Sequence, residues 1–213
     1  REVPLIIDAS QSAGVLPLDM EALGAEFIAM PGHKGLLGPQ GTGLLLCGQE
    51  PKPLLFGGTG SESKNQSMPE ELPERLEAGT LNVHGLAGLR AAVDYIGRYG
   101  MDEIRKKEQE LMWAFYNQVR QIPGITVYGD FRDRNRCAIV SLNVRDYDSG
   151  EVSDALSSEY GIATRPGAHC APLMHKALGT VEQGAVRFSF SHYNTMEEIK
   201  IAVSALRELA QEE

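Results

Sequence analysis

The sequence predicts an α/β protein, and three observations lead to this prediction. Short apolar runs suited to buried strands alternate with turn and helix signals in the first part of the chain. Two amphipathic helices follow, over 86–99 and 101–122, with apolar residues at helical spacing. Beyond residue 124, alternating strands and capped helices indicate a smaller α+β unit. We therefore expect a partial large domain over 1–100 and a small domain over 101–213.

The net charge, the cysteine count and the lengths of the apolar stretches exclude several classes of protein. The 213 residues carry a formal net charge of −9, which argues against a general affinity for nucleic acid or anionic membranes. Three cysteines at unpatterned positions make a disulfide framework unlikely to form and favour the reducing cytoplasm. No apolar stretch has the length of a membrane span.

The first region contains three apolar runs, predicted as buried strands over 3–8, 27–30 and 43–47. Asp8 ends the first strand, at the edge where open α/β sheets bind ligands. Residues 19–24 are predicted as a short helix with an aspartate cap and a glycine stop. Because a buried parallel strand needs neighbours and the sequence lacks an initiator methionine, we expect a fragment of a longer chain.

Residues 30–43 place a single lysine, Lys34, among glycines and prolines between two of these strands. Glycine permits close backbone approach and proline stiffens turns, so the base of Lys34 should be fixed. Such a lysine suits a Schiff base with a carbonyl cofactor. A plain glycine-rich connection with an exposed lysine is the alternative.

Residues 51–82 are predicted as a long loop, a feature that is uncommon inside a compact domain and usually functional. Two pieces, 57–61 and 77–82, offer backbone N–H groups and hydroxyls to an anion. Ordinary turns without a ligand are the alternative.

The small domain should contain strands and helices in alternation. The predicted strands are 125–128, 138–144, 162–164 and 186–191, and the predicted helices are 150–160 and a terminal helix that begins at a capping box at Thr195 and reaches Ala210.

Among the three cysteines, Cys170 has the surroundings that best suit a reactive thiol. It lies in a loop beside His169 and after Arg165, and nearby positive charge favours the thiolate that a nucleophile requires. A surface thiol is the alternative, whereas Cys47 and Cys137 resemble small buried apolar residues. A metal site from His169, Cys170 and His175 matches no usual zinc spacing, so none is predicted.

Arg187 interrupts an apolar strand and could grip a carboxylate with two parallel hydrogen bonds. An arginine on an edge strand facing solvent is the competing interpretation.

Five ordered motifs resemble the fold-type-I pyridoxal-phosphate enzymes of the class V aminotransferase family, in the branch of cysteine desulfurases and selenocysteine lyases. IDASQSAG at 7–14 resembles the cofactor-ring segment, and GHKGLLGPQGTG at 32–43 resembles the lysine loop. EAGTLN at 77–82 resembles the segment that reaches the partner subunit's phosphate. RPGAHCAP at 165–172 and VRFSFSHYNT at 186–195 resemble the active-site cysteine loop and the substrate-arginine segment.

The resemblance implies a role for each site residue. Lys34 would bind pyridoxal 5′-phosphate (PLP) covalently and move the substrate's α-proton, and Cys170 would attack the substrate sulfur to form a persulfide. Arg187 would bind the carboxylate of L-cysteine or L-selenocysteine. The cofactor-binding residues would be Asp8 at the pyridine nitrogen, Gln11 at the phenolic oxygen, His33 at the phosphate or ring, and Thr80 across a homodimer interface.

The sequence departs from the family pattern in two ways. Pro31 stands where the family often has serine or threonine, so part of the phosphate contact is expected to be missing. The family's large N-terminal portion, with a phosphate loop and a ring-stacking residue, is not among these residues.

We therefore expect a cytoplasmic cysteine desulfurase in an N-terminally incomplete chain, with a sulfur-acceptor protein as a partner. Other class V PLP chemistry, either transamination or selenocysteine lysis, is one alternative. A non-catalytic remnant that only dimerises is the other.

Overall fold

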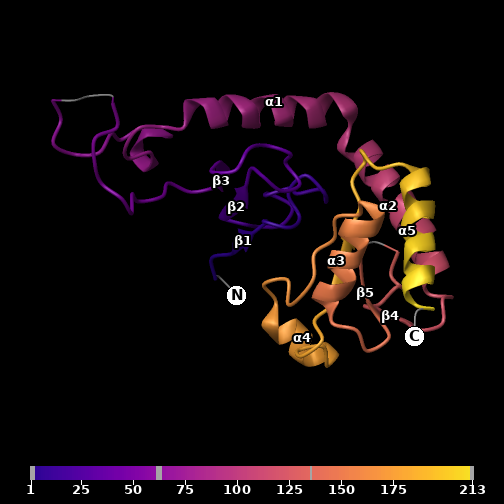
Figure 1. Ribbon diagram of the computed structural model, residues 1–213. Coiled ribbons are helices and arrows are strands. Elements are labelled where there is room, and N and C mark those ends of the chain that lie inside the picture. The colour runs from indigo at the N-terminus through magenta and orange to yellow at the C-terminus, as the bar shows by residue number, and fades with distance from the viewer. Residues whose placement is uncertain (1–2, 61–63, 135, 212–213) are drawn as a thin grey trace. The chain divides into compact units, whose positions relative to one another are not determined.

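A computed structural model describes residues 3–60, 64–134 and 136–211, and the chain separates into two compact units, Arg1–Met101 and Asp102–Glu213. Helices and two small sheets alternate along the chain, which confirms the predicted α/β class (Figure 1). None of the helices in the described ranges is long and apolar enough to cross a bilayer.

The first unit is built on a three-stranded sheet in the order β1-β2-β3. These strands are β1 (Ile6–Asp8), β2 (Phe27–Pro31) and β3 (Gly43–Cys47). β1 runs parallel to β2, and β3 runs antiparallel to it with Pro31 opposite Gly43. The lysine loop is therefore the connection between two antiparallel strands. A small apolar core lies beside this sheet, made of Ala9, Ala13, Ala25, Ile28, Met30, Leu36 and Leu89.

The prediction that all three strands are buried is wrong for two of them. Ile6 of β1 is 67% exposed and Leu45 of β3 is 48% exposed, whereas Ile28 of the central strand is fully buried. The reason is topological, because β1 and β3 are the edge strands and the described residues do not cover their outer surfaces.

The predicted helix over 19–24 is a single turn. The Asp19 carboxylate accepts from the backbone N–H of Ala22, and Gly24 takes a left-handed φ of 61°, so both end signals act as predicted. Too few residues separate them for a helix to propagate. The long loop contains a 3₁₀ turn, η1 (Glu74–Leu76), and then α1 (Val83–Tyr99) begins with Asn82 as its N-cap.

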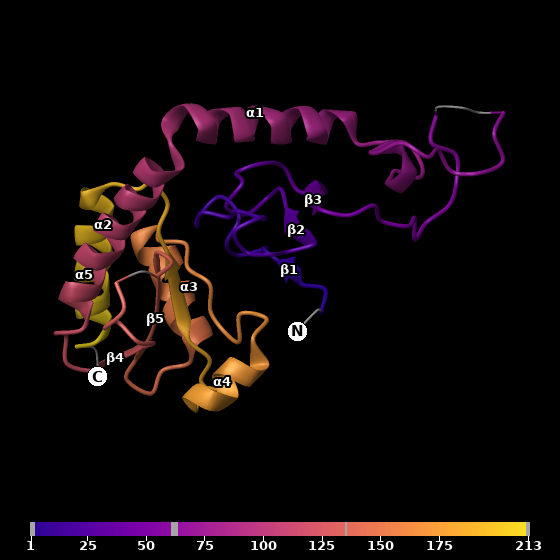
Figure 2. The same ribbon diagram turned by 180° about the vertical axis from the view of Figure 1, so that it is seen from behind.

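The second unit packs helices on an antiparallel sheet in the order β4-β5-β6 (Figure 2). Its strands are β4 (Ile125–Tyr128), β5 (Ile139–Val144) and β6 (Val186–Ser189), and the long helices are α2 (Met101–Val119), α3 (Ser149–Tyr160) and α5 (Met196–Leu209). Side chains from all six elements form one core, with Met112, Phe115, Leu142, Leu156, Val186 and Leu206 fully buried.

Two features of this unit differ from the sequence-based expectation. Residues 162–164 form no strand, and the chain there contributes only a single antiparallel bridge, between Arg165 and Arg187. A short helix that the sequence analysis did not predict, α4 (Pro172–Leu178), follows the cysteine loop. Seven residues are too few to show a helical period.

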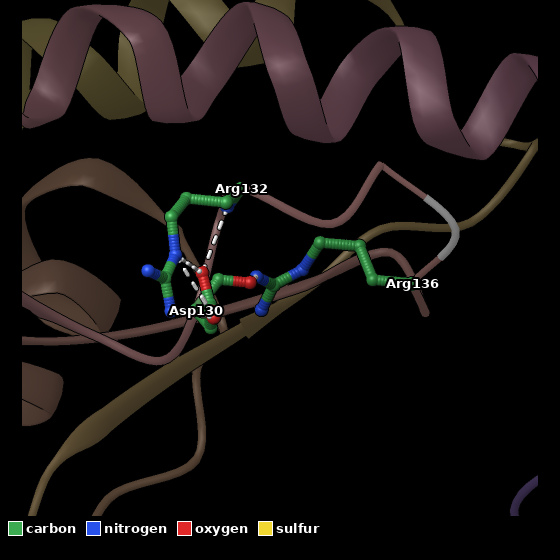
Figure 3. A network of polar contacts seen from close by, with 3 residues as sticks. All are labelled: Asp130, Arg132 and Arg136. Atoms are coloured by element: carbon green, nitrogen blue, oxygen red, sulfur yellow. Dashed lines mark hydrogen bonds and ion pairs between the residues drawn. The ribbon is translucent and has the colours of Figure 1, made fainter.

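A polar turn between β4 and β5 is held by contacts among Asp130, Arg132 and Arg136 (Figure 3) and by ring stacking beside them. The Asp130 carboxylate accepts from the Arg132 guanidinium, and the Arg136 guanidinium donates to the Asp130 carbonyl. Arg136 also lies over the Phe131 ring, which stacks on Tyr116 of α2. The contacts with Arg132 hold the pKa of Asp130 far below its usual range.

Candidate active-site groups

The lysine loop is closed by its own backbone. The Gly32 N–H donates to the Thr42 carbonyl over 2.8 Å, and the Gly38 N–H donates to the Gly32 carbonyl over 2.7 Å. Leu37, at a left-handed φ of 59°, donates its N–H to the Lys34 carbonyl over 2.9 Å. The main chain at Lys34 is therefore fixed at both ends, while the side chains of His33 and Lys34 are exposed.

Helix α1 holds this loop from the outside through Leu89, which is 3% exposed. A Cβ placed on Gly38 would lie 2.8 Å from Leu89 Cδ1, and one placed on Gly32 would lie 3.1 Å from it. Real Cβ atoms do not tolerate the first distance, so glycine at position 38 permits the close approach. The glycines therefore pack the loop against α1.

The Asp8 segment and the lysine loop meet backbone to backbone. A Cβ on Gly14 would overlap the carbonyl of Gly35, and a Cβ on Gly35 would overlap the carbonyl of Ala13. This contact joins the motifs at 7–14 and 32–43, which the sequence analysis singled out separately. It sets the Lys34 backbone at a fixed place relative to Asp8.

Asp8 is an exposed carboxylate that stays ionised. The Ser10 hydroxyl donates to its Oδ1, and the Ser10 N–H donates to the same oxygen over 2.9 Å. These two hydrogen bonds, and then the positive charge of Lys34, lower the pKa of Asp8 below its ordinary value. Gln11 is exposed in the turn that follows.

Asp8 lines an open hollow of about 1170 Å³ within the first unit, whose lining among the described residues does not include Lys34, His33, Gln11 or Thr80. Its lining is mostly apolar and includes Met30, Leu44, Leu72, Leu76 and Leu86. The two glycine-containing pieces of the long loop are joined by a backbone hydrogen bond, in which the Gly79 N–H donates to the Gly58 carbonyl over 2.7 Å. Thr80 follows this contact and is exposed.

The cysteine loop of the second unit has an unusual backbone. His169 and Cys170 are consecutive non-glycine residues with positive φ, 52° and 59°. A left-handed L-residue costs about 1–2 kcal/mol, so the surrounding contacts must hold this conformation. It leaves the Cys170 side chain exposed, with Arg165 Nη2 donating to Cys170 Sγ over 3.3 Å.

Arg187 lies on β6 directly opposite Arg165. Their backbones exchange both hydrogen bonds of the bridge, over 3.2 and 2.9 Å. Arg187 is half-buried, and its Nε has no hydrogen-bond partner in the described part of the chain. Burial and the charge of Arg165 lower the pKa of Arg187, while Cys170 acts in the opposite direction. A partly dehydrated guanidinium with an unused donor is suited to binding an anion.

The sequence analysis did not predict the contacts of two further residues, His175 of α4 and Thr180 just after that helix. His175 is 4% exposed and hydrogen-bonds through its ring to His169 and to Thr180, which is 3% exposed. The sequence analysis weighed His175 only as a weak metal ligand. Its contacts depend on α4, so only a correct prediction of that helix could have revealed them.

The model of the family described as Aminotransferase class-V matches residues 1–201. The chain belongs to the class-V aminotransferase family. This match spans both units and includes the Asp8 segment, the lysine loop, the cysteine loop and the Arg187 strand.

Within the class-V family, the chain is similar to proteins named as cysteine desulfurases. It is 40% identical over 212 residues to a probable cysteine desulfurase of Methanothermobacter thermautotrophicus, covering 96% of this chain and 52% of that protein. It also resembles the apo structure of a cysteine desulfurase from Thermococcus onnurineus, with a TM-score of 0.86, 32% identity, and coverage of 98% of this chain and 53% of that one. The cysteine desulfurase CsdA of Escherichia coli, in an S-sulfonic acid form, gives a TM-score of 0.84 at 27% identity, with coverage of 97% and 51%. The chain spans about half the length of the curated relatives it matches.

Proposed function

We propose that this chain is the part of a PLP-dependent cysteine desulfurase that supplies its lysine and its cysteine. The observation that carries the proposal is the exposed Cys170 with the Arg165 guanidinium on its sulfur. Amino-group transfer by a class-V enzyme needs no thiol nucleophile, whereas removal of sulfur from cysteine does. Membership of the family and the names of the relatives support the same reaction.

The residues of the first unit fit PLP. An ionised carboxylate, Asp8, lies close enough to Lys34 for the lysine charge to lower its pKa, and Asp8 would pair with the pyridine nitrogen. Lys34 would hold the cofactor covalently, Gln11 would contact its phenolic oxygen, and His33 its phosphate or ring. Pro31 offers no N–H or hydroxyl at the position where the family often has serine or threonine.

When bound, PLP supplies an electron sink for the bonds around the substrate's α-carbon. Lys34 then acts as the base that takes up and returns the α-proton, and Arg187 binds the substrate carboxylate. The Cys170 thiolate would attack the sulfur of L-cysteine, forming an S–S bond as the Cβ–S bond breaks, and the electron pair left on Cβ would take up a proton, equivalent to the one that left the Cys170 thiol, to complete the methyl group of alanine. L-Cysteine and the thiol enzyme become L-alanine and an enzyme persulfide, so atoms and electrons balance.

We further propose a cytoplasmic homodimer that passes its sulfur to an acceptor protein. Three free cysteines among the described residues support a reducing compartment. The exposed Cys170 supports access for an acceptor. Thr80 would reach the phosphate of the partner subunit's cofactor.

The role of Lys34 is tested by trapping the cofactor. The protein that carries this chain is incubated with PLP, reduced with borohydride and mapped by mass spectrometry, and the adduct is expected on Lys34. Lys34→Ala should abolish it, because no other amine has the same fixed position. Lys52→Ala, which removes an exposed lysine elsewhere in the same unit, is the matched control and should leave it intact. An adduct of equal yield in Lys34→Ala would refute the assignment.

The role of Cys170 is tested by sulfide and alanine release from L-cysteine. Cys170→Ala should lower release more than about 100-fold, since it removes the nucleophile, and should leave the Lys34 adduct unchanged. Cys137→Ala, a half-buried cysteine of the same unit, should retain release. Sulfide release that survives Cys170→Ala would exclude the persulfide step, and amino transfer to a keto acid in that variant would support the aminotransferase alternative.

A further inference from the structure

His175 and Thr180 form a buried polar pair behind the cysteine loop. Helix α4 ends at Leu178, and its C-cap Gly179 turns the chain back with a left-handed φ of 72°. The Thr180 N–H then donates to the His175 carbonyl over 2.9 Å, and the Thr180 hydroxyl lies 2.8 Å from His175 Nδ1. An imidazole so deeply buried must satisfy its ring nitrogens within the protein.

This pair is connected to the sulfur by hydrogen bonds to both ends of Arg165, whose backbone carbonyl and guanidinium are joined by the covalent frame of the residue. His175 Nε2 lies 3.3 Å from His169 Nδ1, and His169 Nε2 lies 2.8 Å from the Arg165 carbonyl oxygen. The guanidinium of the same arginine donates to Cys170 Sγ over 3.3 Å. Four contacts therefore link a buried threonine to the exposed thiol.

The Arg165 carbonyl fixes which atom donates and which accepts in each of the hydrogen bonds that lead from it to Thr180. A carbonyl oxygen only accepts, so His169 must carry a proton on Nε2. In the neutral ring, Nδ1 of His169 then accepts, which requires His175 to donate from its own Nε2. Nδ1 of His175 is left as an acceptor, and the Thr180 hydroxyl is its donor.

The surroundings favour a neutral His169. Burial is the largest cause that lowers the pKa of His169, and the positive charges of Arg187 and Arg165 act in the same direction, against the hydrogen bond to the Arg165 carbonyl. Both ring nitrogens of His169 are occupied, so this ring is not available to take a proton from Cys170. Among the described residues, the cation that contacts the sulfur is Arg165.

We propose that Thr180 and His175 are positioning residues for Cys170: acting through neutral, Nε2-protonated His169, they hold Arg165 against the sulfur. This inference rests on the proposed function for its purpose, because a placed thiolate is what sulfur transfer requires. The geometry itself is present without cofactor or substrate. It can therefore be tested separately from catalysis.

The first test measures the rate at which iodoacetamide alkylates Cys170 in this chain at neutral pH, by peptide mass spectrometry. Thr180→Val keeps the shape and removes the hydroxyl, and should slow alkylation about fivefold, the effect of losing one hydrogen bond. Thr180→Ser restores the hydroxyl and should return the rate to within about twofold. Cys170 is already exposed, so loosening the loop adds little access that could mask the loss.

Arg165→Gln acts on the sulfur without altering the buried pair and should slow alkylation at least as much as Thr180→Val. Cys137 is the internal control, and its rate should not change. An unchanged alkylation rate of Cys170 in Thr180→Val would overturn the positioning role, whether or not Arg165→Gln slows alkylation. A parallel change at Cys137 would indicate general unfolding and would overturn it too.

The second test determines the tautomers by ¹⁵N NMR of the two imidazoles at neutral pH. Both rings should show a protonated Nε2 and a bare Nδ1, and Thr180→Val should perturb Nδ1 of His175. A proton on Nδ1 of His169, or a charged ring, would overturn the inference. Neither test uses PLP or L-cysteine, so a failed desulfurase assay with these results intact would count against the proposed function alone.

Discussion

At the scale of single residues, Asp8 shows how a short turn sets the charge of a site. Its carboxylate is exposed, yet two hydrogen bonds from Ser10 stabilise the ionised form. A carboxylate whose folded pKa is lowered contributes stability that is present above its unfolded pKa, 3.8, and is lost as the pH falls through the folded value. The turn therefore extends the pH range over which Asp8 is negative to below its ordinary pKa.

We expect Ser10→Ala to raise the pKa of Asp8 toward its ordinary value, because the side-chain hydrogen bond is the largest cause of the shift. The Asp8 carboxyl is titrated by ¹³C NMR in both proteins. Ser12→Ala removes a hydroxyl from the same turn and serves as the control, with no expected change. An unchanged titration in Ser10→Ala would show that Lys34 or the backbone bond sets the charge.

The roles of single residues were predictable from the sequence where a motif surrounds them. Lys34 and Cys170 are exposed on constrained loops, as their glycine and proline neighbours suggest, although their roles stay predictions. His175 was not predictable, because its partner His169 is brought to it by a helix and two left-handed residues. Local pattern does not encode a backbone conformation that tertiary contacts impose.

At the scale of elements, the capping signals were the most reliable guides. Thr195 accepts from the Glu198 N–H over 3.3 Å, and the Glu198 carboxylate accepts from the Thr195 N–H over 2.7 Å, so α5 begins with the predicted reciprocal box. The second bond lowers the pKa of Glu198. Capping residues that lie too close together did not predict a helix correctly, since Asp19 and Gly24 enclose only a single turn.

Removing the Thr195 hydroxyl, which accepts from the Glu198 N–H in this capping box, should destabilise the second unit. Thr195→Ala is expected to lower the free energy of unfolding by about 1 kcal/mol, whereas Thr195→Ser keeps a capping hydroxyl and should leave it nearly unchanged. Trp113 of α2 is the single tryptophan and lies in the second unit, so its fluorescence during urea denaturation reports the change. Equal stability of the alanine and serine variants would mean that the Glu198 side chain alone caps α5.

At the scale of the whole molecule, the two units differ in the size of their apolar cores. The core of the second unit contains 20 buried residues in the described ranges, and that of the first contains seven, three of them alanine. Leu44, Leu45 and Leu46 of β3 are each about two-fifths exposed or more. An unbroken leucine run indicates a strand correctly, but whether it is buried depends on what covers the sheet.

This difference predicts unequal resistance to unfolding. Buried apolar area is the main stabilising contribution, so the backbone of the first unit should exchange its amide hydrogens faster and unfold at lower urea. Hydrogen exchange with peptide-resolved mass spectrometry compares Ile28 of β2 with Leu142 of β5, each fully buried in its central strand. Coincident unfolding of both strands would contradict the prediction.

The left-handed backbone at position 170 also says something about why a cysteine is there. At a φ of 59° alanine and serine bear a steric strain similar to that of cysteine, so either replaces Cys170 with little change in that strain, whereas glycine would relieve about 1 kcal/mol of it. Stability alone would therefore select glycine at this position. A cysteine at this position therefore carries a steric cost, and the proposed role of its sulfur as the nucleophile would account for a side chain here.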